Sequence, residues 1–221
     1  MRFSYWEASS FLNYIDDLII GGGIVGISTA IELKKLHPEK NIVVVDRDPF
    51  SAGASTKNAG FACFGSASEL IDDLETMPEE EVFSLVKRRY NGLLNLQNLL
   101  GKESMDYLPC GGIELFRSGD EELFDTCLQK LDYLNSQLEK ILGFRPYSKM
   151  EVLPNFEGST KFIGGIFNSH EGSINSGKMM RALIAKAQSV GVRFINGLNI
   201  LNVTQKTNSV AVEWEGYSNT V

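Results

Sequence analysis

Three glycines and one aspartate carry the clearest chemical signal in this chain of 221 residues. Gly21, Gly23 and Gly26 have the spacing GxGxxG, and Asp46 follows 20 residues after the last of them. Glycines at this spacing let the backbone turn sharply and approach a pyrophosphate, whose charge is held by free N–H groups at a helix start. A carboxylate about 20 residues further on binds a ribose hydroxyl. These four residues therefore predict a dinucleotide-binding site.

The segments around the glycines have the character that such a site requires. Residues 18–20 form a short apolar strand before the turn, and residues 42–45 form an unbroken apolar run that ends at Asp46. Between the two runs, apolar side chains recur at helical spacing until Pro38. Strand, helix and parallel strand in this order form a βαβ unit, so we expect an α/β protein with a Rossmann-like domain. A glycine turn that binds no nucleotide is the alternative.

The glycine turn and the acid are used by both FAD and nicotinamide cofactors, and the next segment favours FAD. Residues 49–70 read PFSAGASTKNAGFACFGSASEL, a predicted loop of small and hydroxyl-bearing residues where a simple nicotinamide domain would begin its next helix. The motifs GGGIVG, VVVDRD and GASTKNAGF, in this order, resemble the FAD-dependent oxidoreductase family of D-amino-acid oxidase, glycine oxidase and monomeric sarcosine oxidase.

The resemblance implies a role for each part of these motifs. The glycine loop and Ser55 with Thr56 would hold the pyrophosphate, Asp46 with Arg47 the adenosine ribose, and residues 58–61 would run beside the flavin ring. The backbone of Ile200 would meet the adenine. The implied cofactor-binding residues are Gly21, Gly22, Gly23, Ile24, Val25, Gly26, Asp46, Arg47, Ser55, Thr56, Asn58, Ala59, Gly60, Phe61 and Ile200.

The mode of attachment depends on Asn58. Some relatives have a histidine near this position that tethers the flavin covalently, and asparagine cannot form that bond. We therefore expect non-covalently bound FAD.

The resemblance continues into an inserted domain. Residues 110–116, CGGIELF, resemble the first strand of the family's substrate-binding domain, and residues 170–201 resemble the return to the cofactor domain. Two amphipathic helices are predicted, one over residues 82–97 that is closed by Gly101 and one over residues 124–141 that ends at Gly143. We predict an FAD-binding domain in two segments, residues 1–80 and 172–221, and an α+β substrate-domain portion over residues 81–171.

The last predicted element of this chain corresponds to a point well before the end of a family member. After a β-hairpin, residues 198–203 with 209–214, the family continues into the rest of the substrate domain and a final segment that binds the substrate carboxylate. We therefore expect this chain to be the N-terminal portion of a longer protein, truncated at its C-terminus. Catalytic residues cannot be assigned from this portion.

The predicted activity is that of an enzyme, an FAD-dependent oxidoreductase acting on an amino acid or secondary amine. Hydride would pass from the substrate carbon to flavin N5, giving an imine that water hydrolyses. One alternative is a dinucleotide-binding module or subunit that needs a partner to complete its site. A nicotinamide-dependent dehydrogenase is a third reading, which the loop after Arg47 and the inserted domain oppose.

Composition and the scarcity of reactive side chains exclude other classes. The net charge of −7 disfavours nucleic acid and anionic membranes as partners. The sequence has no signal peptide and no apolar run long enough to span a membrane. His37 and His170 belong to no hydrolytic or metal-binding pattern, so no metal is expected. Three scattered cysteines fit a reducing compartment, and we predict a cytoplasmic protein.

Two minor expectations concern packing. Tyr5, Trp6 and Phe11 form an aromatic group that is expected to pack a short leader helix onto the core. Cys63 follows the predicted flavin loop and is expected to be a small buried apolar residue rather than a redox group.

Overall fold

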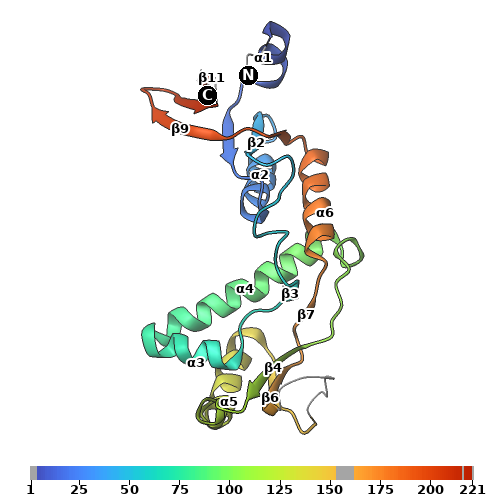
Figure 1. Cartoon of the computed structure of the whole chain (residues 1–221), viewed down its shortest axis with the longest axis vertical. Coiled ribbons are helices and arrows are strands. Elements are labelled where there is room, and N and C mark those ends of the chain that lie inside the picture. The colour runs from blue at the N-terminus through green and yellow to red at the C-terminus, as the bar shows by residue number, and fades with distance from the viewer. Residues whose placement is uncertain (1–3, 153–161, 216, 221) are drawn as a thin grey trace. The chain divides into compact units, whose positions relative to one another are not determined.

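The chain folds into two compact units, which a computed structural model describes for residues 4–152, 162–215 and 217–220 (Figure 1). Unit 1 comprises Met1–Ala59 and Ser176–Val221, and unit 2 comprises Gly60–Asn175. The helices are α1 (Tyr5–Phe11), α2 (Ile24–Leu36), α3 (Ala67–Thr76), α4 (Glu79–Leu100), the short 3₁₀ helix η1 (Glu103–Met105), α5 (Glu121–Leu142) and α6 (Ser176–Ser189). The strands are β1 (Asp17–Ile20), β2 (Ile42–Asp46), β3 (Phe61–Ala62), β4 (Gly112–Arg117), β5 (Tyr147–Lys149), β6 (Phe162–Asn168), β7 (Gly172–Ser173), β8 (Arg193–Asn196), β9 (Ile200–Gln205), β10 (Val210–Trp214) and β11 (Tyr217–Thr220).

Unit 1 is built on a parallel sheet with the strand order β1-β2-β8. Residues 42–45 of the central strand β2 are all buried, which explains why this strand is an unbroken apolar run. Helix α2 connects β1 to β2, and α2 packs against α6. Both helices bury an apolar face, which α2 makes from Ile27, Ala30 and Ile31. The predicted α/β class and βαβ unit are therefore confirmed.

A second, antiparallel sheet with the order β11-β10-β9 completes unit 1. Its Val212 and Trp214 join an apolar cluster with Val43 and Val45 of β2. The predicted hairpin is present, although its first strand begins at Ile200 rather than at residue 198.

The predicted leader helix forms, but the expectation that its aromatic side chains are buried is wrong. Ser4 caps α1 by accepting from the Glu7 N–H, and Glu7 reciprocates at the Ser4 N–H. Tyr5, Trp6 and Phe11 remain 76%, 74% and 63% exposed. The capping box therefore holds this short helix together without core packing from its aromatic rings.

Unit 2 combines an antiparallel sheet, order β4-β6-β5, with the helices α3, α4 and α5. The long helices end at Gly101 and Gly143, both with positive φ, as the sequence predicted. One buried polar contact ties α5 to β5: the Asn135 side-chain amide donates to the Tyr147 carbonyl (2.8 Å) and accepts from the Tyr147 N–H (3.0 Å). This pairing explains why an asparagine is buried on an otherwise apolar helix face.

The unit boundaries differ from the predicted domain boundaries at residues 80 and 171. The chain passes into unit 2 after Ala59 and returns after Asn175. The larger difference is at the first boundary, which was predicted at residue 80 and lies after Ala59. It arises because α3 forms within a segment whose small and polar residues predicted a loop. Its Leu70 and Ile71 are buried in the core of unit 2, so the segment belongs with α4 and α5. No helix within the described ranges is long and apolar enough to cross a membrane.

Candidate functional site

The glycine loop between β1 and α2 has a backbone shape that two of its glycines require. Gly21 has φ +109°, in the region that favours glycine, and its N–H donates to the Val45 carbonyl at 2.8 Å. A Cβ on Gly26 would lie 2.0 Å from the Gly21 carbonyl oxygen, closer than atoms can approach. The loop can therefore turn tightly from strand to helix only with glycine at both positions.

Asp46 lies at the carboxyl end of β2 and holds this loop directly. Its Oδ2 accepts from the Gly22 N–H at 2.7 Å, and its Oδ1 accepts from the Asp48 N–H at 2.9 Å. A carboxylate oxygen can accept more than one hydrogen bond, so the half-buried side chain retains capacity for a ligand hydroxyl. Asp46 and the glycine loop, which were predicted to form one site, are thus in direct contact, and the ribose contact of Asp46 stays a prediction.

Two serines after β2 bring a second segment onto the glycine loop. The Ser55 hydroxyl accepts from the Ile24 N–H at 3.0 Å, and the Ser51 hydroxyl donates to the Gly22 carbonyl at 2.6 Å. A Cβ on Gly23 would lie 3.1 Å from the Ser55 oxygen, so the two segments are in close contact. Ser55 was predicted, whereas Ser51 was not: nothing distinguishes it in sequence from the other hydroxyl residues of this loop.

The first turn of α2 still has backbone donors to offer. The N–H groups of Val25 and Gly26 have no acceptor in the part of the chain that the structure describes. Together with the positive end of the helix dipole, they form a cradle suited to an anionic phosphate.

Several predicted residues lie further from this cradle. Arg47 has a 77% exposed side chain whose Nε lies 4.0 Å from Asp48 Oδ2. Thr56 donates to the Ser51 carbonyl (2.7 Å) and Asn58 to the Ala54 carbonyl (3.0 Å), so both side chains stabilise the loop itself. Ala59 is exposed. Ile200 pairs with Trp214 in the antiparallel sheet of unit 1.

Known families confirm what this geometry suggests. The family model described as FAD dependent oxidoreductase matches residues 16–219, nearly the whole chain. The chain belongs to this FAD-dependent oxidoreductase family. The prediction of the family and of its FAD cofactor is thereby confirmed. The cradle fits that cofactor, because free backbone donors, tight glycine packing and the acid predicted to bind the ribose lie together at one edge of the sheet.

Relatives of this FAD-dependent oxidoreductase chain are longer than it is. The Bifunctional protein ThiO/ThiG of Synechocystis sp. is 28% identical over 88% of this chain but only 26% of its own length. L-saccharopine oxidase of Schizosaccharomyces pombe is 24% identical over 81% of this chain and 40% of its own. Glycine oxidase from Geobacillus kaustophilus shares the fold, with a TM-score of 0.64 at 18% identity, over 92% of this chain and 52% of that one. The chain thus spans about half or less of the proteins it matches.

Gly60 and Phe61, the last two residues of the predicted flavin loop, belong to unit 2. Gly60 has φ +75°, and a Cβ there would lie 2.3 Å from the Ile174 carbonyl oxygen. Its own carbonyl accepts from the Ile174 N–H at 2.8 Å, next to the short pairing of β3 with β7. Phe61 is 76% exposed and forms part of the wall of a pocket.

This pocket has a volume of about 290 Å³ and lies within unit 2. The residues that line it include Phe61, Cys63, Gly65, Glu114, Tyr147 and Glu171. Burial is the main cause that raises the pKa of the Glu171 carboxyl to about 7, and the nearby Glu114 adds to it. Burial likewise raises the pKa of the Tyr147 hydroxyl, which donates to the Gly65 carbonyl at 2.6 Å. Sequence reasoning missed both groups, because neither belongs to a recognisable motif.

Two other predicted features are also in unit 2. Cys63 is exposed, so the expectation of a buried thiol is wrong: its neighbours Ala62 and Phe64 are the buried residues of this stretch. Its pKa is raised by partial burial and by Glu171. The His170 ring stacks on Phe144, with ring centroids 3.6 Å apart, and burial lowers its pKa. His170 therefore has a packing role here.

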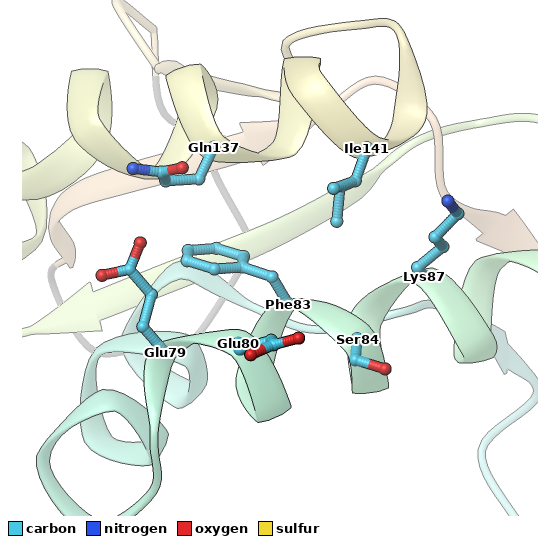
Figure 2. A pocket seen from close by; sticks show the side chains of 7 residues that line it. All are labelled: Glu79, Glu80, Phe83, Ser84, Lys87, Gln137 and Ile141. Carbon is cyan, nitrogen blue, oxygen red and sulfur yellow. The ribbon is translucent and has the colours of Figure 1, made fainter.

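A larger hollow of about 500 Å³ lies between α4 and α5, and Figure 2 shows its lining. The Phe83 ring lies between the two helices, while Glu79 and Lys87 stand at opposite ends of the hollow. None of the residues predicted to bind the cofactor lines it. The pocket that contains Phe61 is therefore the better candidate for a substrate-facing site in unit 2.

Proposed function

We propose that this chain forms the FAD-binding portion of an oxidoreductase that oxidises an amino acid or a secondary amine. The observation that carries the proposal is the contact of three segments at one point: the glycine loop, Asp46 and Ser55. This arrangement presents backbone donors to phosphates and a carboxylate to a ribose, in a chain whose family depends on FAD.

The chain's own residues would bind and orient the cofactor. The amides of Val25 and Gly26 would hold the pyrophosphate, Asp46 the adenosine ribose, and residues 58–61 would run beside the ring. Asn58 offers no covalent attachment, which supports non-covalent binding. When bound, the flavin would supply the hydride acceptor at N5, and the substrate, after losing a hydride and a proton, would leave as an imine that water hydrolyses.

The substrate class rests on similarity. A glycine oxidase and an L-amino acid deaminase from Proteus vulgaris share the fold, the latter with a TM-score of 0.67 at 19% identity. The name L-saccharopine oxidase likewise describes a relative that oxidises a substituted amino acid. An amino acid is the substrate class common to these names, and the secondary amine is added from the family resemblance of the sequence motifs.

A reconstitution experiment tests the proposal. The purified chain is mixed with FAD or with NAD and passed through a desalting column. Retained FAD is detected by visible absorption of the protein, and retained NAD by ultraviolet absorption of the supernatant after the protein is precipitated. We expect flavin absorption to stay with the protein, and NAD to wash through. A colourless protein after FAD treatment would overturn the proposal, and retained NAD would favour a nicotinamide enzyme instead.

The substrate class has its own test. The FAD complex is mixed anaerobically with amino acids and with secondary amines, and the flavin absorption is followed. Bleaching by members of these classes is expected. A spectrum unchanged by all of them would contradict the proposed activity of this chain while leaving its cofactor binding intact.

Localisation is also a proposal. The three cysteines, Cys63, Cys110 and Cys127, are unpaired in the structure, which supports the cytoplasm. Cell fractionation with an antibody to the protein would test this, and recovery from an oxidising compartment would contradict it.

A further inference from the structure

The chain that follows Phe61 is held against the sheet of unit 2 by side chains from distant residues. We call residues 61–66 the pocket segment, because Phe61, Cys63 and Gly65 in it line the pocket. The Phe64 N–H donates to Glu171 Oε1 at 3.3 Å, and the Gly65 carbonyl accepts from the Tyr147 hydroxyl at 2.6 Å. The segment is thus fixed at two adjacent residues, at Phe64 through a donor and at Gly65 through an acceptor.

The start of the next helix is fixed in the same way. Glu114 Oε2, on β4, accepts from the N–H groups of Ala67 and Ser68 at 3.1 and 3.4 Å. A carboxylate at a helix start satisfies free donors and interacts favourably with the helix dipole. Glu114 therefore anchors the end of the pocket segment, and its charge is already compensated locally.

Glu171 is set into place by its own surroundings. It lies between β6 and β7, and its backbone carbonyl accepts from the Gly111 N–H at 3.0 Å. A Cβ on Gly112 would come within 2.1 Å of Glu171 Oε2, so glycine at this position leaves the room that the carboxyl group occupies. Asn168, which is 4% exposed, lies close enough to lower the Glu171 pKa. The carboxyl group is therefore built into the sheet end and is not a mobile surface charge.

We propose that Glu171 is a positioning residue: by holding the Phe64 amide, it fixes the pocket segment and so sets where Phe61 and Cys63 stand in the pocket wall. The importance of this for catalysis rests on the proposed function, in which Phe61 runs beside the flavin ring. The hydrogen bond between Glu171 and the Phe64 amide lies within unit 2, and its effect is measurable without a cofactor.

The charges that face Glu171 determine how the hold depends on pH. Titratable groups on neighbouring elements are Cys63, Glu114 and Tyr147, and Glu69 lies beyond them in an ion pair with Arg89 (2.9 Å). None of the lining residues of the pocket is a lysine, arginine or histidine. Ionised Glu171 therefore gains from an opening that returns it to water, and the hold should weaken as the pH rises towards its pKa of about 7.

Amide hydrogen exchange on the full 221-residue chain tests the proposal. We compare the wild type with Glu171→Ala, which removes the acceptor, and with Glu171→Gln, which keeps an acceptor oxygen but does not titrate. In Glu171→Ala the Phe64 amide should exchange up to about tenfold faster, as expected for losing one intramolecular hydrogen bond. In Glu171→Gln the Phe64 amide should keep most of its wild-type protection.

The pH profile separates positioning from simple space filling. After correction for intrinsic exchange, Phe64 protection in the wild type should fall several-fold between pH 5.5 and 7.5, and it should be flat in Glu171→Gln. Glu122→Gln, which removes an exposed charge on α5, serves as the matched control and should match the wild type. The Ile174 amide, bonded to Gly60, reports on whether β3 and β7 remain paired.

Three outcomes would overturn the proposal: unchanged Phe64 protection in Glu171→Ala, the same loss in Glu122→Gln, or a wild-type profile as flat as that of Glu171→Gln. If Glu171→Ala does not fold, the comparison of wild type with Glu171→Gln across pH still decides. Because FAD is absent from all these samples, failure of FAD binding would overturn the proposed function and leave the Glu171 result standing.

Discussion

The glycine loop of unit 1 and the pocket segment of unit 2 are both irregular stretches fixed by a carboxylate, but they are built differently. Asp46 reaches the Gly22 amide across 24 residues, within a single βαβ unit. Glu171 reaches the Phe64 amide across 107 residues. The first carboxylate holds a loop whose shape a fixed spacing of glycines already imposes, whereas the second holds a segment without that spacing.

The two regions differ in whether backbone or side chains form the binding surface. In the glycine loop the backbone makes the binding surface, so the required residues are those that let the backbone turn and pack. In the pocket segment the exposed Phe61 and Cys63 form the surface, and the supporting residues come from other elements. We therefore expect substitutions to act on backbone packing in unit 1 and on side-chain support in unit 2.

Gly26→Ala should have the largest effect, because it attacks backbone packing. The new Cβ would meet the Gly21 carbonyl oxygen at 2.0 Å, and backbone at that place cannot give way cheaply. We expect a loss of about 2–3 kcal/mol in the free energy of unfolding and no measurable FAD binding. Denaturant unfolding and FAD fluorescence titration measure the two effects.

The matched control is Gly53→Ala, in the loop after β2, where a Cβ would meet nothing within 4 Å and φ is not positive. Its unfolding free energy should stay within about 0.5 kcal/mol of the wild type. Equal effects at Gly26 and Gly53 would contradict the packing argument.

Asp46→Ala should come next and should act mainly on the ligand. It removes the acceptor for the Gly22 and Asp48 amides together with the proposed ribose contact. Losing a charge-assisted hydrogen bond predicts about a 10–100-fold weaker FAD affinity, measurable by fluorescence titration. Asp48→Asn, two residues further along the same loop, is the control and should change the FAD affinity less than about threefold. An unaltered affinity in Asp46→Ala would refute the proposed ribose contact.

Tyr147→Phe probes the support of the pocket segment. It leaves the Gly65 carbonyl without the hydroxyl that now donates to it at 2.6 Å in a buried site. We expect a loss of about 1–2 kcal/mol in unfolding free energy, measured with urea. Tyr133→Phe, at a 39% exposed side chain, is the control and should lose less. If both variants lose the same amount, the buried hydrogen bond does not support the segment.

The smallest expected effect is the pH dependence of stability caused by Glu171. Its pKa in the folded state, about 7, lies above the ordinary glutamate value of 4.5, so the folded state favours the protonated carboxyl. The wild type should therefore lose stability relative to Glu171→Gln as the pH rises from about 4.5 to 7. With allowance for solvent screening of this half-buried group, we expect a change of about 1 kcal/mol or less.

Urea unfolding of the two proteins at pH 5 and pH 8 measures this difference. A constant difference between them at both pH values would show that Glu171 does not titrate in the folded state with a raised pKa.

The comparison also explains which parts of the structure were predictable from sequence. The loop, its acid and the flanking strands follow from Gly21, Gly26 and Asp46, because the interactions are local and repeat with a fixed spacing. The helix α3 was missed because Ser66, which caps it, and the small residues before it are typical of loops. Glu171 and Tyr147 were missed because long-range packing, and not local spacing, brings them to Gly65 and Phe64.

The discontinuity of unit 1 affects how the chain is made. The central strand β2 pairs with β8, so that Val43 lies opposite Arg193. A ribosome completes every residue of unit 2 before it adds the strand that closes the sheet of unit 1. The glycine loop therefore emerges early but waits for β8, the third strand of its sheet, while all residues of unit 2 are made sooner. The order of synthesis thus lets unit 2, in the middle of the chain, complete its fold before unit 1, which contains the beginning of the chain.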